Sequence, residues 1–327
     1  MLPGTSNSTD PLTQARLFPE RVFYATGVLL NADDFHAEQL YHRDRLARAL
    51  AYLHGSGTVA GLAVEWKSRL EPGGTEGEQT FPNGRDEEIV VHPGLAIDRL
   101  GRLIEVPEPA CIRLQNWLAH QSQSDLRSAH HPLPGTDGST PIAISRGGGP
   151  TAQDGPITVG NGRRGLVVDV FLRFVLCEKG YTPSFAAGAT DATDAAVPDR
   201  YQERYELSLI LRPEPTQPQA ATLGLIDKLP DRRWQSLTSV AALQAALLHD
   251  TWKGTGNPHL SSPNEYVNEI QDMTSVFLAR LLVPMVESQA GLVHSPTERV
   301  QVDNYSRSFM YPTEAIAAQL VRLMTAT

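Results

Sequence analysis

Ile89 to Val106, with the sequence IVVHPGLAIDRLGRLIEV, is the stretch that decides the fold. It contains three short apolar runs, which are separated by Pro93-Gly94 and by the turn Asp98-Arg-Leu-Gly101. Proline, glycine and aspartate at such breaks are typical of tight reversals between strands. Together with the apolar run from Thr58 to Trp66, the stretch predicts a compact β-meander.

The segment before the meander predicts a helix from Asn31 to Gly55 of about six turns. Asn31 is a suitable N-cap, and Gly55 lies where a left-handed C-cap glycine belongs. Acidic side chains in the first turn favour the positive end of the helix dipole. The acidic residues and the apolar residues that follow at helical spacing are Asp33, Asp34, Leu46, Leu50 and Leu53.

Two further strands are predicted after a long polar segment. In Leu166 to Cys177, LVVDVFLRFVLC, apolar residues occupy every second position, which is typical of a strand with one buried face. ERYELSLIL, Glu203 to Leu211, has the same alternation. Residues 178–200 should connect the two strands as a long hairpin or a crossover, and we expect both to join the meander in one sheet.

The C-terminal part predicts helices. One begins near Ser236, one begins at the capping sequence Ser262-Pro-Asn-Glu265, and a last one runs from about Thr313 to Met324. In the second, an apolar stripe precedes Pro284 and consists of Ile270, Met273, Phe277 and Leu281.

The predicted fold class is therefore α+β, in which a mainly antiparallel sheet carries a long N-terminal helix and a C-terminal helical group. The segments are a flexible arm (1–20), a helix plus β-meander module (21–118), a polar Pro/Gly-rich insertion (119–165), a strand pair completing the sheet (166–212), a linker (213–235) and a C-terminal helical region (236–327).

Composition restricts the partners. The 327 residues carry a net charge of −9, which repels phosphate backbones and argues against nucleic acid as a partner. No segment approaches the roughly 20 apolar residues of a membrane helix, so we expect no direct membrane insertion and a cytoplasmic location. The sequence predicts no cofactor.

The sharpest catalytic candidate is a set of acidic and histidine residues on the first predicted helix, of which His36, Glu38 and His42 would serve a metal-dependent hydrolase. The full set is Asp33, Asp34, His36, Glu38, His42 and Asp44. Glu38 and His42 are i, i+4 neighbours, so one helix face could supply two ligands of a hydrolytic metal. Neither HEXXH nor an HxE followed by PCxxC is present. We favour the other interpretation, in which carboxylates serve the helix dipole and Glu38, His42, Arg43 and Arg45 form a solvated or ion-paired face.

Three segments carry a resemblance to a known family. Gly57 to Glu65, Ile89 to Asp98 and Gly101 to Val106 resemble a module of structural components of phage-tail-like contractile injection systems. The preceding helix and the later FLRF and RYELSL strands fit the same family, so the resemblance covers roughly residues 25 to 212. The motif residues are Asp34, Phe35, Glu38, Tyr41, Arg45, Gly57, Gly61, Pro93, Gly94, Asp98, Gly101 and Arg102.

The resemblance implies a non-enzymatic structural subunit, in or around the baseplate, whose partners are other tail or baseplate subunits and further copies in a symmetric homo-oligomer. The long segments Lys67 to Glu88 and His120 to Gly165 depart from the family pattern. Two alternatives remain open. One is a receptor- or glycan-binding module using the aromatic residues Tyr181, Phe185, Tyr201 and Tyr205, and the other is the metal-dependent hydrolase.

Overall fold

The structure is a computed structural model that describes residues 20–132, 164–183, 196–212, 241, 274–289, 291–295, 298–305 and 307–325. Its helices are α1 (Ala32–Leu53), α2 (Leu114–Ala119), α3 (Gln123–Ser128) and α6 (Thr313–Thr325). Its strands are β1 (Gly57–Gly61), β2 (Val64–Lys67), β3 (Gly74–Glu76), β4 (Gln79–Phe81), β5 (Glu88–Val91), β6 (Gly94–Ile97), β7 (Leu103–Val106), β8 (Ala110–Arg113), β9 (His130–Pro132), β10 (Arg164–Pro183), β11 (Ala196–Arg212), β12 (Val276–Ser288), β13 (Gly291–His294) and β14 (Gln301–Asp303).

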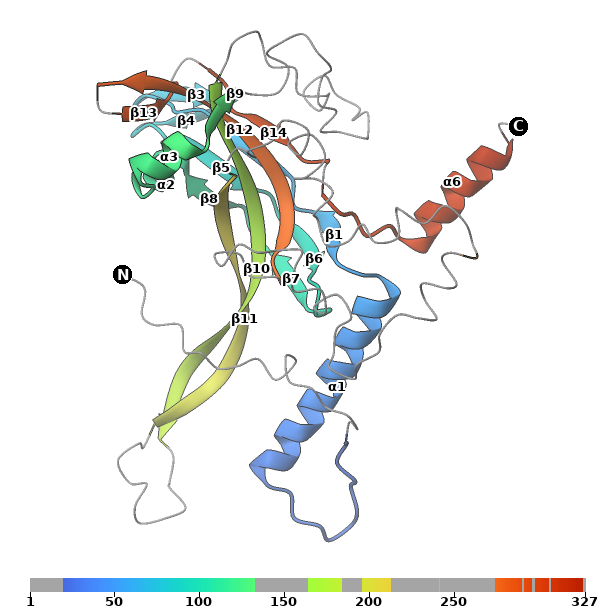
Figure 1. The fold of residues 1–327 in the computed structure, drawn as a ribbon. Coiled ribbons are helices and arrows are strands. Elements are labelled where there is room, and N and C mark those ends of the chain that lie inside the picture. The colour runs from blue at the N-terminus through green and yellow to red at the C-terminus, as the bar shows by residue number, and fades with distance from the viewer. Residues whose placement is uncertain are drawn as a thin grey trace.

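The named strands all pair antiparallel, in four sheets, so the architecture is mostly antiparallel β with a few helices. Two three-stranded sheets have the orders β1-β6-β7 and β2-β5-β8, and β3 and β4 form a hairpin. A six-stranded sheet has the order β11-β10-β12-β13, with β14 beside β12 and β9 beside β10. Figure 1 shows the long strands β10, β11 and β12 of this sheet running side by side through the centre of the molecule.

The prediction of one continuous meander is wrong, because the chain changes sheets twice within it. The run Thr58 to Trp66 is divided between β1 and β2 at Leu62, whose φ is +58°. β5 and β6 likewise belong to different sheets on either side of Pro93-Gly94. The two points at which the chain changes sheets are in contact, because Leu62 N donates a hydrogen bond to Pro93 O at 3.2 Å. Each point therefore helps to fix the position of the other.

β10 and β11 form the long hairpin that was one of the two predicted connections. Their register runs from Val167 opposite Arg212 to Pro183 opposite Ala196. The sequence predicted that both strands join the sheet of the meander, and this prediction is wrong. In the structure β10 pairs with β9 and β12, and neither β10 nor β11 belongs to the sheets of β1 to β8. Pairing with β12 ends at Leu172, and the rest of the hairpin extends away from the sheet as a two-stranded arm (Figure 1).

The predicted helical region 236–327 is wrong for its central part. Val276–Ser288 is the strand β12, and its first ten residues are all buried. The run VFLARLLVPM is nearly all apolar, and such a run fits a strand covered on both faces as well as a helix. α6 agrees with the predicted last helix, whereas the capping sequence at Ser262 and nearly all of the helix from Ser236 lie outside the described residues.

Both polar segments contain regular secondary structure in their described parts. Lys67 to Glu88 contains the β3–β4 hairpin, and the beginning of the 119–165 insertion forms α3 and β9. Leu126 on α3 is buried, at 1% exposure, because α3 covers part of the core. That core is one apolar cluster to which both three-stranded sheets and the six-stranded sheet contribute, including Leu62, Ile89, Ile104, Leu172 and Leu281.

Candidate functional site

The motif turn Asp98 to Arg102 is the most strongly constrained part of the chain that the sequence singled out. Asp98 is fully buried, and its Oδ1 accepts hydrogen bonds at 2.9 Å from the backbone N–H groups of Leu100 and Arg102. The Arg102 guanidinium donates through Nε to Asp98 Oδ2 at 2.6 Å. It also lies 4.6 Å from the ring centroid of Phe174 on β10, so the turn is clamped to the central hairpin.

Gly101 connects this turn to α1. Its φ is +82°, and a Cβ built on it would lie 1.8 Å from Ala47 O in the helix. The absence of a side chain therefore lets the helix backbone lie directly on the turn. The buried apolar residues of α1 are Leu40, Ala47 and Ala51, all at most 9% exposed, and Ala47 is the one that meets Gly101. The turn thus acts as the joint between α1 and the sheets.

The loop between β14 and α6 makes a separate set of contacts, at the break between β1 and β2. Asn304 accepts from Val64 N through Oδ1 at 2.8 Å and donates to Val64 O through Nδ2 at 2.9 Å. The buried Arg307 donates to Leu62 O at 2.7 Å, and burial lowers the pKa of its guanidinium to about 10. Met310 N donates to Thr58 O at 2.8 Å. These contacts stabilise the break between β1 and β2. No local pattern in the sequence predicts the break, because the residues that stabilise it are distant in the chain.

The acidic and histidine residues of α1 serve the helix. Asn31 and Asp34 form a capping box, with Asp34 N donating to Asn31 Oδ1 at 3.0 Å and Asn31 N donating to Asp34 Oδ2 at 2.9 Å. Glu38 Oε1 lies 3.0 Å from Nε2 of His42, whose side chain is 70% exposed. Over the described ranges, no group of three or more His, Cys, Asp or Glu side chains could hold a metal ion. His36 is exposed and joins no such group.

Asn31→Ala is expected to destabilise the protein by about 1 kcal/mol, because it removes the side chain that accepts from the first turn of α1. Urea unfolding followed by circular dichroism measures this loss. Ser122, which caps the short α3 by accepting from Asp125 N at 3.0 Å, gives a comparison at the cap of another helix. An unchanged midpoint for Asn31→Ala would show that the capping box does not contribute to stability.

The opposite face of α1 exposes large apolar side chains. Phe35 is 54% exposed, Leu46 57% and Leu53 77%. The segment before the helix adds Phe23 and Leu29, at 84% and 95% exposure. Figure 1 shows α1 extending away from the sheets, so these side chains lie on a projecting element. Exposed apolar groups gathered in one place are typical of surfaces that bind another protein.

The aromatic residues considered for glycan binding do not form one surface. Tyr181 and Tyr201 are 67% and 57% exposed on the projecting arm. Their register places them on opposite faces of the hairpin, since Tyr201 pairs with Glu178 and Tyr181 pairs with Pro198. Tyr205 packs against the core, and Phe185 lies outside the described residues. The arm therefore offers one tyrosine on each face.

A buried ion network crosses the six-stranded sheet. Asp169 on β10 accepts from Arg280 on β12 at 2.7 and 2.9 Å, and from Arg212 on β11 at 2.6 Å. The carboxylate is 1% exposed. Burial opposes its ionisation, but the two guanidinium groups outweigh that effect and hold the pKa of Asp169 below its usual value. Sequence reasoning missed this network because its members come from three separate segments of the chain.

The low pKa of Asp169 predicts a loss of stability in acid. A carboxyl with a lower pKa in the folded state stabilises the protein above the unfolded pKa, near 4, and loses that contribution as pH falls through the folded pKa. The free energy of unfolding should therefore fall steeply below about pH 4. Urea titrations at a series of acidic pH values measure it. The slope should be shallower in Asp169→Asn, and equal slopes would contradict the assignment.

A second buried group ties the β12–β13 hairpin to the β2-β5-β8 sheet. Glu87 accepts from Trp66 Nε1 at 2.5 Å and from Gln115 Nε2 at 3.0 Å. Nδ1 of His294 lies 3.4 Å from Glu87 Oε2. Burial lowers the pKa of His294, against the opposing effect of Glu87. Glu87 thus connects Trp66, Gln115 and His294, while Nε2 of the buried His294 makes no hydrogen bond within the described residues.

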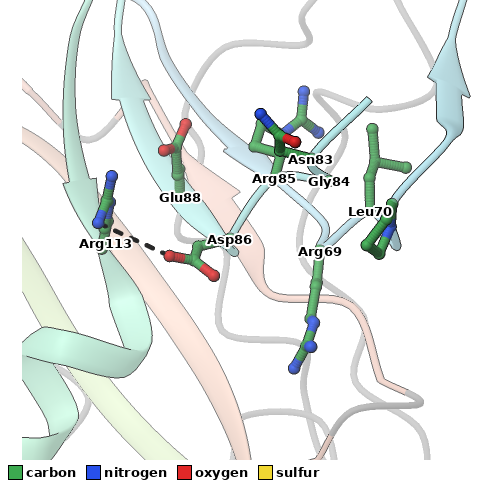
Figure 2. Close-up of a pocket in the computed structure, with 9 residues that line it drawn as sticks. Arg69, Leu70, Asn83, Gly84, Arg85, Asp86, Glu88 and Arg113 are labelled. Atoms are coloured by element: carbon green, nitrogen blue, oxygen red, sulfur yellow. Dashed lines mark ion pairs between the residues drawn. The ribbon is translucent and has the colours of Figure 1, made fainter. Parts of the chain in front are cut away.

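An open polar cleft of about 360 Å³ lies beside the β3–β4 hairpin (Figure 2). Arg113 and Asp86 face each other across it at 3.8 Å, while Arg69 lies apart from this pair. Arg85 is held by Glu76, by Ser68 O at 3.1 Å and by the ring of Phe81. Neighbouring side chains thus compensate the charges of Arg85, Asp86 and Arg113, and the residues that line the cleft do not form a nucleophile with a base.

In the described part of the chain, most of the motif residues lie at three places, which are the turn that meets α1, the point where the chain changes sheets, and α1 itself. Asp98, Gly101 and Arg102 form the joint, while Pro93 and Gly94 form the sheet crossing with Gly61, whose added Cβ would lie 2.2 Å from Pro93 O. Gly57 meets the C-terminal loop at Ser308. Asp34, Phe35, Glu38, Tyr41 and Arg45 lie along α1, and Arg45 stacks on Tyr41.

Two further findings bear on function. Within the described ranges, no helix combines the length and the apolar character needed to cross a bilayer. Exposed apolar side chains are instead concentrated on α1 and the segment before it, where another protein could cover them.

The chain was also compared with models of known protein families and with curated proteins, and nothing in either set matches it.

Proposed function

We propose that the protein is a non-enzymatic structural subunit of a phage-tail-like contractile injection particle, in or around the baseplate, and that it acts through protein–protein contacts. The observation that carries the proposal is the projecting helix α1, which exposes Phe35, Leu46 and Leu53 to solvent. The joint at Gly101 holds this helix. A helix held firmly while its apolar side chains face water is suited to assembly rather than to catalysis.

The resemblance of the motif segments to components of such particles supports the same proposal. The motif residues in this chain are used for close backbone contacts and for clamping α1, as the example of Gly101 against Ala47 O shows. None of them lines the polar cleft beside β3 and β4. Their role is mechanical, because they fix how the helix is presented to a neighbour.

Particles purified from the source cells test the proposal. We expect the protein to be found in them by mass spectrometry, at a constant ratio to the sheath and tube subunits. Deletion of its gene should leave particles that are incomplete or absent in electron micrographs. Particles that lack the protein, or a deletion strain whose particles are indistinguishable from wild type, would overturn the proposal.

A receptor- or glycan-binding role is the second candidate, favoured by the two exposed tyrosines on the arm. A projecting two-stranded ribbon can reach a target beyond the body, and an exposed aromatic ring can stack on a sugar. Tyr181→Ala and Tyr201→Ala should then each reduce binding to cells or to a glycan array. Binding by the wild-type protein that does not exceed a control protein would exclude this role.

A further inference from the structure

The exposed face of α1 has the spacing of a coiled-coil seam. Its six positions are separated by 4, 3, 4, 3 and 4 residues, which is the alternation of a and d positions in a heptad. All six are exposed, and they are Phe35, Gln39, His42, Leu46, Ala49 and Leu53. With about 100° per residue, they fall within one narrow stripe along the helix. We call this set the α1 stripe.

The stripe lies opposite the face that packs on the body. Leu40, Ala47 and Ala51 are buried, and their positions lie about 120° or more around the helix from the middle of the stripe. Because Gly101 meets the helix at Ala47, the body lies behind α1 and the stripe points outward. A partner helix could therefore lie along the stripe without displacing the turn that holds α1.

The polar members of the stripe indicate which partner fits. An entirely apolar partner helix would leave Gln39 facing side chains that offer it no hydrogen bond, whereas His42 already contacts Glu38 on its own helix. In a parallel, in-register pair of identical helices each position meets its own copy, so the Gln39 amides can bond to each other. A polar residue that pairs with itself at a seam position is known to fix register. An antiparallel pair along the whole stripe would place Gln39 opposite Ala49 and His42 opposite Leu46.

The charges beside the stripe favour the same arrangement. Glu38 and Arg43 occupy flanking positions five residues apart, which in a parallel pair bring a carboxylate of one copy beside a guanidinium of the other. The antiparallel alternative would bring Arg43 beside Arg43 and Arg45 beside Arg45 of the second copy, and like charges repel. Charge complementarity thus selects parallel copies of this chain.

We propose that copies of this protein associate through their α1 stripes, with the helices parallel and in register. This inference rests on the proposed assembly function and names the contact by which copies of the subunit join. Its tests use the purified full chain alone. The protein can consequently be present in particles while this contact fails, and the contact can exist even if the particle assignment is wrong.

The first test is the molar mass of the full-length protein, measured by light scattering over a concentration series. We expect two or more chains for the wild type and a single chain for Leu46→Glu, which puts a charge in the middle of the stripe. Ile316→Glu is the matched control, because Ile316 is 48% exposed on another helix, α6, and should leave the mass unchanged. A wild type that is a single chain throughout, or an oligomer that Leu46→Glu does not affect, would overturn the proposal.

The second test keeps the proposal falsifiable if Leu46→Glu fails to fold. In a background with Cys111→Ser and Cys177→Ser, a single Leu46→Cys should form a disulfide-linked dimer under mild oxidation, since in-register seam positions lie within disulfide range. His36→Cys, exposed on the same helix but outside the stripe, should link far less. No link at position 46, or linking only between Phe35→Cys and Leu53→Cys proteins when mixed, would show that the parallel arrangement is wrong.

Discussion

Asp169→Asn is expected to destabilise the protein by about 3–5 kcal/mol, the range found when one member of a buried ion pair is removed. The substitution keeps the shape of the side chain and removes its charge. Arg280, which is 7% exposed, and Arg212, which is 14% exposed, would then lose the carboxylate that binds both of them, and Asp303 would be the remaining acidic group acting on Arg280. Urea unfolding at neutral pH measures the loss.

Glu206→Gln is the matched control for this prediction. Glu206 pairs with Arg173 across the same two strands, β10 and β11, but the two side chains are 53% and 36% exposed. Exposed pairs contribute about 0–1 kcal/mol, because water and salt screen them. The same acid-to-amide change should therefore have a small effect here. Similar losses for the two variants would mean that the Asp169 network is no more important than a surface pair.

Local signals in the sequence predicted the features whose causes are local. Asn31 caps α1 because its side chain reaches the N–H of Asp34, three residues away. Gly55 follows the helix with a φ of +81°, which glycine adopts without strain. The alternation in Leu166 to Cys177 indicated a strand, since a period of two needs no partner to be recognised. These features depend on residues within a few positions of one another.

Features that depend on distant residues were not predictable. Arg280 lies 111 positions from Asp169, and nothing near either residue indicates the other. β12 was mistaken for a helix because its first ten residues are buried on both faces, so the strand has no polar face to give it a period of two. The separation of β1 from β2 depends likewise on Asn304 and Arg307 in the C-terminal loop.

The orientation of α1 shows how the candidate site was only partly predictable. Leucine spacing predicted the helix correctly, yet Leu46 and Leu53 face solvent, and small residues such as Ala47 and Ala51 face the body. Apolar residues were thus present on two faces, and sequence alone does not say which face the body covers. The answer comes from Gly101, which allows the close approach at Ala47.

Gly101→Ala is expected to cost about 1–3 kcal/mol more than Gly55→Ala, because only the first substitution forces atoms into occupied space. The two glycines share nearly the same left-handed backbone, with φ values of +82° and +81°. An alanine at either position therefore carries a similar backbone cost of about 1–3 kcal/mol. A Cβ at Gly55 meets nothing within 4 Å, whereas one at Gly101 would lie 1.8 Å from Ala47 O.

The difference between the two variants thus measures the contact that holds α1 on the body. Urea unfolding gives the two free energies, and hydrogen exchange of the helix amides from Leu40 to Ala51 shows whether α1 has moved. Gly101→Ala should increase exchange there, while Gly55→Ala should affect only the last turn. Equal losses of stability would contradict the close contact at Ala47.

The same two variants should also differ in assembly. If the contact at Gly101 is lost, α1 no longer has a fixed orientation relative to the sheets, so assembly should weaken in Gly101→Ala and persist in Gly55→Ala.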